Sequence, residues 1–482
     1  MAGGMELWAI VPELVLAGWV LVLLPLGPFL PSARKGVTTW VAVAGLAAAA
    51  IASARMVSWP HQSVFLDTYA VDSFAVYFKL FAITVTEIVL LATHGHFRGR
   101  PHESEVPALL VLTCLGMIGL AASQDLVLIA LFVQLVTVGS YILVGIAKED
   151  RHATEGALKL FLFSAAAGAV MLYGMSLLYG LTGTLRLPEL ALRLPTMPPL
   201  TVLAALGLVL VGYGFKITVV PFHAWAPDTY QGAPTPIAGF LSVGPKAAGL
   251  AVLLRTLQVA FPRDLGNWTQ DMAMLAALTM TVGNLFALRQ TSVKRLLAYS
   301  SIAQAGYLLV GVAAATRDVL AVPGLLFYLV VYLFMNLGAF LAVDGIERQI
   351  GTDERERFAG VGGRLPLSAA VLTISLLSLA GFPPFGGFVG KTMLFGAALG
   401  AGWAWLAVIM GMNIALSLYY YVRVIELLYL RPVPERSFNQ EPTALRFALI
   451  VLALGSILTG AMPQFWVTWA SQAARLLAAS TI

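Results

Sequence analysis

The sequence predicts an all-α polytopic membrane protein with about 14 transmembrane helices, which is the class typical of chains whose solvent is mostly lipid. First, 59% of the 482 residues are hydrophobic and only 11% are charged, whereas a soluble domain carries about 25% charged residues. Second, apolar runs of about 20 residues, each long enough to cross a hydrocarbon core, recur along the whole chain. Third, two of these runs contain prolines and glycines at comparable places.

The predicted helices follow the apolar runs in chain order. Three of them make an N-terminal part, residues 1–105: 7–30, 37–57 and 73–93. Five belong to a first repeat, residues 106–257: 106–122, 124–147, 156–181, 200–222 and 235–257. Five belong to a second, inverted repeat, residues 258–430: 271–289, 293–315, 321–346, 367–399 and 402–430. The last helix, 444–470, lies in the C-terminal part, residues 431–482.

The basic residues predict the orientation. An even number of spans places both termini on one side. If that side is outside, the inner loops contain fifteen Lys and Arg residues and the outer segments only five, the asymmetry expected when basic loops stay in the cytoplasm. The inner set is Arg34, Lys35, Arg98, Arg100, Lys148, Arg151, Arg289, Lys294, Arg295, Arg348, Arg355, Arg357, Arg364, Arg431 and Arg436; the outer set is Arg186, Arg193, Arg263, Arg317 and Arg475. We therefore expect both termini to face outside.

Two pairs of segments predict the internal duplication. SYILVGIA (140–147) resembles GYLLVGVA (306–313), with Tyr141 and Tyr307 166 residues apart. The break at Pro221 in GFKITVVPFHAWAPD and the break at Pro383 and Pro384 in AGFPPFGGFVGK are 162–163 residues apart. Paired, interrupted helices in inverted repeats indicate a transport site near the bilayer midplane.

The composition excludes several kinds of site. The single cysteine, Cys114, allows neither a disulfide within the chain nor a cluster of cysteine metal ligands. The histidines show no ligand spacing on a helix, and no glycine-rich phosphate loop follows a strand-like segment. We therefore expect no nucleotide, flavin or metal site in this chain. Basic residues confined to short loops also argue against nucleic acid.

Ionisable residues within the spans are the candidate functional groups. Lys216 and Lys391 lie beside the two breaks, and Lys246 follows Pro245. A lysine at the centre of a membrane helix costs about 2.5–3.5 kcal/mol on insertion scales, so three such lysines predict a polar interior. Burial lowers the pKa of a lysine, and this suits a group that takes up and releases protons. The alternative is that long lysine stems reach the membrane surface.

Other charged residues are weaker candidates for proton transfer. Lys79 shares a predicted helix with Glu87, and Glu155 precedes Lys159 by one helical turn. Snorkelling or structural pairing competes with a proton-carrying role for both lysines. His223 is able to relay protons near neutral pH or to make structural hydrogen bonds at the break. Glu13 and Glu426 are expected to form structural pairs.

The stretch FKITVVPFHAWAPDTYQGAPTPIAGFLSVGPKAAG (215–249) resembles the antiporter-like membrane subunits of respiratory complex I and of multisubunit cation/proton antiporters. Residues 155–185 and 381–395 are similar to the N-type subunits of bacterial NADH–quinone oxidoreductase. The resemblance covers nearly all the predicted helices. It implies that Lys216, Lys246 and Lys391 form a hydrated polar axis along the membrane plane.

Gln134 departs from the family pattern. The matching position in the fifth helix is usually a glutamate that pairs with the lysine of the seventh helix. Glutamine keeps an acceptor oxygen for the Lys216 ammonium but does not change charge. The family pattern assigns a half-channel to each repeat. Either the carboxylate that tunes Lys216 lies at another position, with Glu155 and Glu87 as candidates, or the half-channel of the first repeat transmits or seals without pumping.

The resemblance implies a membrane subunit of a proton-translocating NADH–quinone oxidoreductase, catalytically silent alone and assembled with homologous membrane subunits. NADH, FMN, iron–sulfur clusters and quinone would act in other subunits of that complex, with no cofactor in this chain. The alternatives are a subunit of a cation/proton antiporter or membrane-bound hydrogenase, and a non-pumping membrane spacer.

Overall fold

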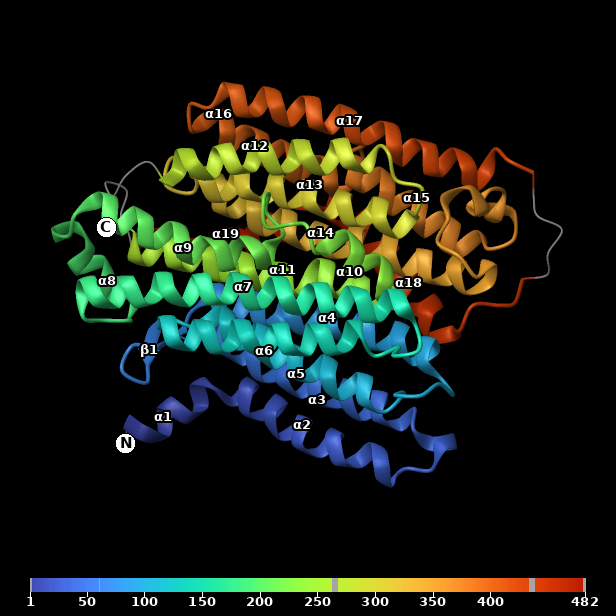
Figure 1. Ribbon diagram of the computed structural model, residues 1–482, viewed down its shortest axis with the longest axis horizontal. Helices are drawn as coiled ribbons and strands as arrows, with labels where there is room; N and C mark the ends of the chain where they lie inside the picture. The colour runs from blue at the N-terminus through green and yellow to red at the C-terminus, as the bar shows by residue number, and fades with distance from the viewer. Residues whose placement is uncertain (1, 60, 262–267, 433–437, 480–482) are drawn as a thin grey trace.

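The computed structural model is a bundle of long helices that lie side by side along the longest axis of the molecule (Figure 1). It describes residues 2–59, 61–261, 268–432 and 438–479. The predicted all-α membrane class is confirmed, with one addition. A short antiparallel hairpin, β1 (Gln62–Val64) and β2 (Tyr69–Val71), pairs Ser63 with Ala70. Three-residue strands are too short for the sequence to have predicted them.

The helices are listed here in chain order. The first nine are α1 (Ala2–Ala9), α2 (Val11–Phe29), α3 (Val37–Arg55), α4 (Ser73–Phe97), α5 (Glu105–Ala122), α6 (Leu126–Val144), α7 (Arg151–Thr182), α8 (Leu187–Arg193) and α9 (Pro199–Ile217). The others are α10 (Ala226–Gly232), α11 (Thr235–Ala260), α12 (Trp268–Ala287), α13 (Val293–Ala314), α14 (Ala321–Ile350), α15 (Pro366–Ala380), α16 (Gly386–Gly400), α17 (Ala404–Tyr429), α18 (Thr443–Ala461) and α19 (Pro463–Ala479). Short 3₁₀ turns are Ser32–Arg34, Met56–Ser58, Leu194–Thr196, Arg355–Phe358 and Val361–Gly363.

Among the described residues, twelve helices are long and apolar enough to cross a membrane, or thirteen if a bent pair around Pro366 forms one span. The protein is therefore a multi-pass membrane protein, and a total of about fourteen spans stays a prediction. Three predicted helices are divided. The run 7–30 is interrupted at Ile10, between α1 and α2. The run 367–399 becomes α15 and α16, and the run 444–470 is interrupted before Pro463, which begins α19 because proline suits the first turn of a helix.

Burial separates a central layer of helices from a peripheral one. The most apolar stretch of α11 is completely buried, and those of α13 and α14 are 94% buried. The corresponding stretch of α2 is only 33% buried, and those of α7 and α17 are 39% buried. Helix α11, which carries Lys246, therefore lies at the centre of the bundle, whereas the peripheral helices expose apolar side chains suited to lipid or neighbouring chains.

Side-chain caps fix the start of several helices. Asp72 accepts a hydrogen bond from the Ala75 amide (2.6 Å) at the start of α4, and Asp125 accepts one from the Val127 amide (2.9 Å) at the start of α6. Asp150 and Ser292 cap α7 and α13 in the same way. These caps satisfy amides that have no partner within the helix, so they fix the ends of helices that carry the candidate site.

The first and last helices reach the hairpin at the same end of the bundle. Ala9 of α1 packs with Tyr69 of β2, and Arg475 of α19 shares a hollow with Trp59 and His61 beside β1. We call this the hairpin end. Two residues used to predict the orientation, Arg263 and Arg436, lie outside the described residues, and the side of the membrane on which the hairpin end lies stays a prediction.

Candidate functional site

The two helix breaks have the same backbone geometry. Helix α9 ends at Thr218 and α15 ends at Gly381, and both residues are left-handed, with φ of 67° and 85°. The next amide then bonds back five residues in each case: Val219 to the Gly214 carbonyl (2.8 Å) and Phe382 to the Leu377 carbonyl (3.0 Å). This helix ending satisfies some terminal carbonyls and leaves others free to accept hydrogen bonds from side chains. Thr218 and Gly381 are 163 residues apart.

Lys216 lies in the last turn of α9 and is only 7% exposed. Its ammonium donates a hydrogen bond to the Thr137 hydroxyl of α6, at 3.0 Å. The Thr137 hydroxyl donates its own proton to the Val133 carbonyl (2.7 Å), so it faces the ammonium as an acceptor. The stem of Lys216 packs against Gly249, one turn beyond Lys246 on α11. Sequence reasoning missed Thr137, although it follows Gln134 by one turn.

Gln134 faces α7. A Cβ atom built on Gly168 would lie 2.9 Å from Gln134 Nε2, a contact that places the amide against that helix. The side chain is half-buried and lines an open, mostly apolar hollow with Leu131 and Leu172. No hydrogen bond of the Gln134 side chain occurs within the described parts of the chain. Thr137 therefore occupies the acceptor position beside Lys216 that we expected for Gln134.

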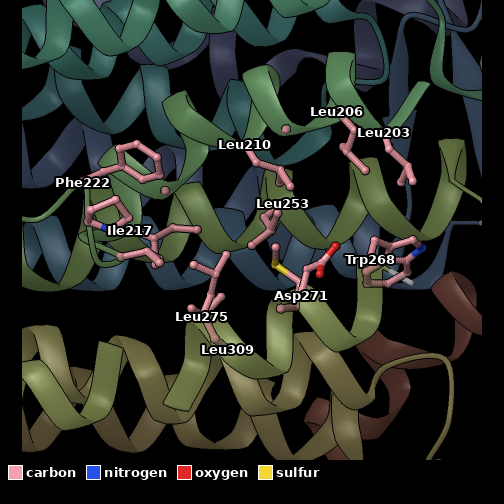
Figure 2. Close-up of a pocket in the computed structure, with 15 residues that line it drawn as sticks. Leu203, Leu206, Leu210, Ile217, Phe222, Leu253, Trp268, Asp271, Leu275 and Leu309 are labelled. Atoms are coloured by element: carbon pink, nitrogen blue, oxygen red, sulfur yellow. The ribbon is translucent and has the colours of Figure 1, made fainter. Parts of the chain in front are cut away.

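A mostly apolar cavity of about 300 Å³ adjoins the first break (Figure 2). Leu206 and Leu210 of α9 line one side and Leu275 of α12 lines the other, with Ile217 next to the break. Figure 2 shows the Asp271 carboxylate directed into this cavity. Apart from that carboxylate, which is exposed, the residues that line this cavity are mostly apolar.

Lys246 is the most central of the three lysines, with 1% exposure. Its ammonium donates to the Ser301 carbonyl (2.7 Å) and hydroxyl (2.5 Å) of α13. It also lies 5.9 Å from the centre of the Tyr332 ring, within reach of a weak cation–π contact. Pro245 removes one backbone hydrogen bond of α11, and the Leu241 carbonyl that would have accepted it receives the Tyr230 hydroxyl instead (3.4 Å).

Lys391 follows the second break on α16 and is 3% exposed. Its ammonium donates to the Leu379 carbonyl at 2.6 Å, one of the carbonyls at the end of α15. It lies 4.8 Å from the centre of the Tyr307 ring. A Cβ atom at Gly381 would lie 3.0 Å from the Lys391 stem, so the glycine both adopts the left-handed turn and leaves room for the lysine.

Polar side chains of α13 connect the surroundings of Lys391 with those of Lys246. Gln304 donates to the same Leu379 carbonyl that holds Lys391 (3.3 Å) and to the Tyr421 hydroxyl (3.4 Å), and its oxygen accepts from Tyr328. Tyr421 in turn bonds Ser300, next to Ser301 in the chain, which holds Lys246. The sequence signal was present in SSIAQAGY, where Ser300 and Gln304 are four residues apart on one helix face.

Glu155 and Lys159 belong to a separate ion cluster. Lys159 contacts Glu155 (2.6 Å) and Asp228 of α10 (2.5 Å), and Arg295 of α13 also contacts Asp228. Burial opposes ionisation of Asp228, but the hydrogen bonds from Lys159 and Arg295 outweigh it and hold the pKa of this carboxyl below its usual value. The Glu155 side chain is 57% exposed. The contacts therefore place Glu155 on Lys159 rather than on Lys216.

The remaining candidates lie apart from the lysines of the axis. Lys79 pairs with Glu13 (2.8 Å), which also accepts from the Tyr69 hydroxyl, so Glu13 forms a pair as predicted. Glu426 contacts Arg431 at 3.5 Å. Glu87, the remaining carboxylate considered for Lys216, is half-buried on α4 and forms no ion pair with another described residue. His223 lies between α9 and α10, and its Nδ1 atom is buried without a partner.

Sequence reasoning also missed a buried ion pair. Arg255 of α11 holds Asp72 through two hydrogen bonds of 2.8 and 3.0 Å, and both side chains are less than 5% exposed. Arg255 also donates to the Ala121 carbonyl (3.0 Å). This pair joins α11 to the start of α4. A two-point contact between a guanidinium and a carboxylate is the geometry that tolerates burial. Across the described residues, no group of three His, Cys, Asp or Glu side chains is arranged to hold a metal ion.

Comparisons with known proteins agree with this architecture. Residues 123–417 match the family model described as NADH:quinone oxidoreductase/Mrp antiporter, transmembrane. The chain is 40% identical over 477 residues to NADH-quinone oxidoreductase subunit N of Trichlorobacter lovleyi, covering 97% of both chains. It is 36% identical to F(420)H(2) dehydrogenase subunit N of Methanosarcina mazei, covering 98% of this chain and 99% of the relative. A chain of respiratory complex I from Thermus thermophilus superposes with a TM-score of 0.82 and 33% identity, covering 95% of this chain and 99% of that one.

Proposed function

The chain belongs to the NADH:quinone oxidoreductase/Mrp antiporter membrane family, and we propose that it is the N-type membrane subunit of a proton-translocating NADH–quinone oxidoreductase. In this role it moves protons while the redox chemistry takes place in other subunits. NADH, FMN, iron–sulfur clusters and quinone act in those subunits. The chain alone is catalytically silent, and its partners are homologous membrane subunits of the same complex and the surrounding lipid.

One observation carries the proposal for this chain's own residues. Three lysines, at most 7% exposed, lie within a membrane bundle and hydrogen-bond only to neutral oxygens among the described residues. A buried ammonium without a carboxylate partner is costly in such a place. A role that requires the amine to gain and lose a proton explains why Lys216, Lys246 and Lys391 are all present.

The proposed path follows the contacts of these lysines. Lys216 packs beside Gly249, one turn from Lys246, so the first two lysines lie on adjoining surfaces of α9 and α11. From Lys246 the path continues through the hydroxyl and amide groups of α13 to Lys391. His223 and Lys159 stay candidates for tuning or relaying protons at the edges of this path. Gln134 and Glu155, which were predicted to do the same, contact none of the three lysines among the described residues, so we expect their effect to be small.

The division into two inverted repeats, 106–257 and 258–430, is part of the proposal. It is supported by two breaks with the same left-handed ending and the same back-bonded amide, 163 residues apart. The N-terminal helices (1–105) and the last helices (431–482) then cover the repeats. We also propose the bacterial inner membrane as the location, with the hairpin end and both termini outside, on the basis of the basic residues in the opposite loops.

A complex reconstituted in vesicles tests the proposal. We expect Lys216→Ala and Lys246→Ala each to remove most of the pH gradient formed per NADH oxidised, while the complex still assembles. The matched control is Lys148→Ala, which removes an exposed lysine after α6. Normal pumping in both axis variants would refute the lysine path.

The alternatives make different predictions for the same preparation. A subunit of a cation/proton antiporter would purify without flavin and iron–sulfur subunits. A hydrogenase-type complex would contain such clusters without NADH oxidation, and the similarity to a subunit of F(420)H(2) dehydrogenase makes the electron donor a point to measure directly. A non-pumping spacer would support NADH oxidation with an unchanged pH gradient in every lysine variant.

A further inference from the structure

We propose that a pocket at the hairpin end binds the phosphate headgroup of an anionic phospholipid. The pocket lies between the end of α11, the connection from α13 to α14, α16 and α19, and its volume is about 560 Å³. That is within the range of small-molecule sites, about 300–1,000 Å³. It lies away from the three axial lysines, and this inference goes beyond the proposed function.

Three nitrogen groups without acid partners line this pocket. Arg317 and Arg475 come from the α13–α14 connection and from α19, and neither guanidinium forms an ion pair within the described ranges. The third is Gln258 of α11, which is 6% exposed and whose Nε2 atom is buried without a hydrogen-bond acceptor. A buried amide without a partner is unfavourable, so an occupant that supplies an acceptor is favoured.

The other polar groups of the pocket do not satisfy these donors. Asp318 also lines it, but its Oδ1 atom accepts from the Leu320 amide (2.8 Å), and its Oδ2 atom lies against Gly400 of α16. The Arg317 guanidinium lies over the Trp403 ring, 5.2 Å from its centre. This contact fixes the direction of the guanidinium without using its N–H groups as donors to an oxygen.

The chemistry of the donors selects the ligand. Two guanidinium groups and an amide N–H offer hydrogen bonds to an anion with several oxygens, and a phosphate diester is such an anion. The pocket also has an apolar wall formed by Val322, Met393 and Val467. A free phosphate ion would leave this wall in contact with water, whereas the glycerol and first acyl carbons of a phospholipid would cover it.

The position of the pocket fits the membrane surface. Gln258 lies two residues before the end of α11, and Arg317 lies four residues before the start of α14, so two of the donors are at the ends of spanning helices. Headgroups of a bilayer lie at that level. An anionic headgroup is favoured over a zwitterionic one because the described lining contains two guanidinium groups and one carboxylate, that of Asp318, so the pocket has a net positive charge.

Lipid binding to the intact, lipid-stripped complex tests this inference without reference to pumping. The complex is incubated with dioctanoyl phosphatidylglycerol, and native mass spectrometry then counts the lipids that remain on this chain. We expect one retained lipid and about tenfold weaker retention for the Arg317→Gln/Arg475→Gln double variant, since charge-assisted hydrogen bonds are lost. Arg186→Gln is the matched control, because it removes an arginine at the same end that already pairs with Glu189.

Gln258→Leu separates binding from folding. It removes an amide that has no hydrogen-bond acceptor when no lipid is bound, so the lipid-free protein should be at least as stable as the wild type. We expect the substitution to weaken lipid retention several-fold. Phosphatidylcholine and inorganic phosphate are the comparison ligands. Equal retention of phosphatidylglycerol by the wild type and the double variant would refute the site. Displacement of the lipid by millimolar inorganic phosphate would identify the free anion as the ligand and overturn the lipid assignment.

Discussion

Lys216 and Lys391 lie beside breaks with the same backbone, but their surroundings differ. The Lys391 ammonium contacts a carbonyl that it shares with Gln304, and Gln304 continues to Tyr328 and Tyr421. The Lys216 ammonium contacts one hydroxyl, Thr137, and the neighbouring cavity is mostly apolar. The second break is therefore connected to further polar groups by hydrogen bonds, and the described residues show no comparable chain of hydrogen bonds at the Lys216 ammonium.

This difference indicates where control of the path would lie. Proton transfer requires a donor and an acceptor within hydrogen-bond reach, directly or through one water. Around Lys391 such groups are already in contact. Around Lys216, Thr137 is the acceptor in contact among the described residues. We therefore propose that a further acceptor comes within reach only when a side chain moves. A neighbouring subunit would then gate this first half of the proposed path, around Lys216, rather than its second half, around Lys391. Four predictions test this contrast, beginning with the largest expected effect.

Removing the Lys391 amine should have the largest effect on proton pumping. We expect Lys391→Ala to lower proton pumping by about tenfold or more, because a proton-transfer group is lost. Lys391→Arg should also impair pumping, since a guanidinium does not release its proton near neutral pH. The pH gradient per NADH oxidised is the measurement. Full pumping by Lys391→Arg would show that charge alone is needed at this position.

The side-chain amides of Gln304 and Gln134 allow a matched comparison of the surroundings of Lys391 and Lys216. Gln304→Leu leaves the Tyr328 hydroxyl without its acceptor, so we expect it to destabilise the subunit by about 1–3 kcal/mol and to lower pumping strongly. Gln134→Leu removes an amide without a hydrogen bond among the described residues, so the expected change in stability is within about 0.5 kcal/mol. Thermal unfolding of the purified complex and vesicle pumping measure both. Similar losses in the two variants would contradict the contrast between the halves.

Thr137 should be a positioning residue of the first half. Thr137→Val keeps the shape of the side chain but removes the oxygen that accepts from Lys216. We expect a several-fold loss of pumping with an unchanged yield of assembled complex, and recovery in Thr137→Ser. Pumping at the wild-type level in Thr137→Val would show that the hydrogen bond has no part in the transfer.

The sequence predicted the parts of this site that depend on composition and on breaks. Lysines inside apolar runs, beside Pro221, Pro245 and Pro384, were enough to single out three lysines that the structure buries, and their proton-carrying role stays a prediction. The groups that accept hydrogen bonds from the lysines were not predicted. Thr137, Ser301 and the Leu379 carbonyl belong to no sequence pattern that distinguishes them, and only the packing of the helices shows that they contact the lysines. Pairing of Glu155 was predicted for Lys159 from their spacing of one turn, but the contact of Lys159 with Asp228, 69 residues away, requires the fold.

The smallest expected effect concerns the departure of Gln134 from the family pattern. In the structure this side chain faces Gly168, and no cation contacts it among the described residues. A carboxylate placed there by Gln134→Glu would be unpaired in apolar surroundings, where binding a proton is less costly than remaining charged. It would then resemble the glutamine that it replaces. We therefore expect pumping close to the wild-type level between pH 6 and 8.

The companion variant is Glu155→Gln. Lys159 keeps its contact with Asp228 when Glu155 loses its charge, so we expect only a small loss of pumping. Two results would contradict this account of the first half. A severe defect in Glu155→Gln would support a relocated switch that acts through Lys159. A clear gain in Gln134→Glu would mean that the new carboxylate turns from Gly168 to Lys216 during turnover, because only an anion that reaches the ammonium is able to change how firmly it holds its proton. In that case the first half lacks a carboxylate, and its single neutral acceptor limits pumping.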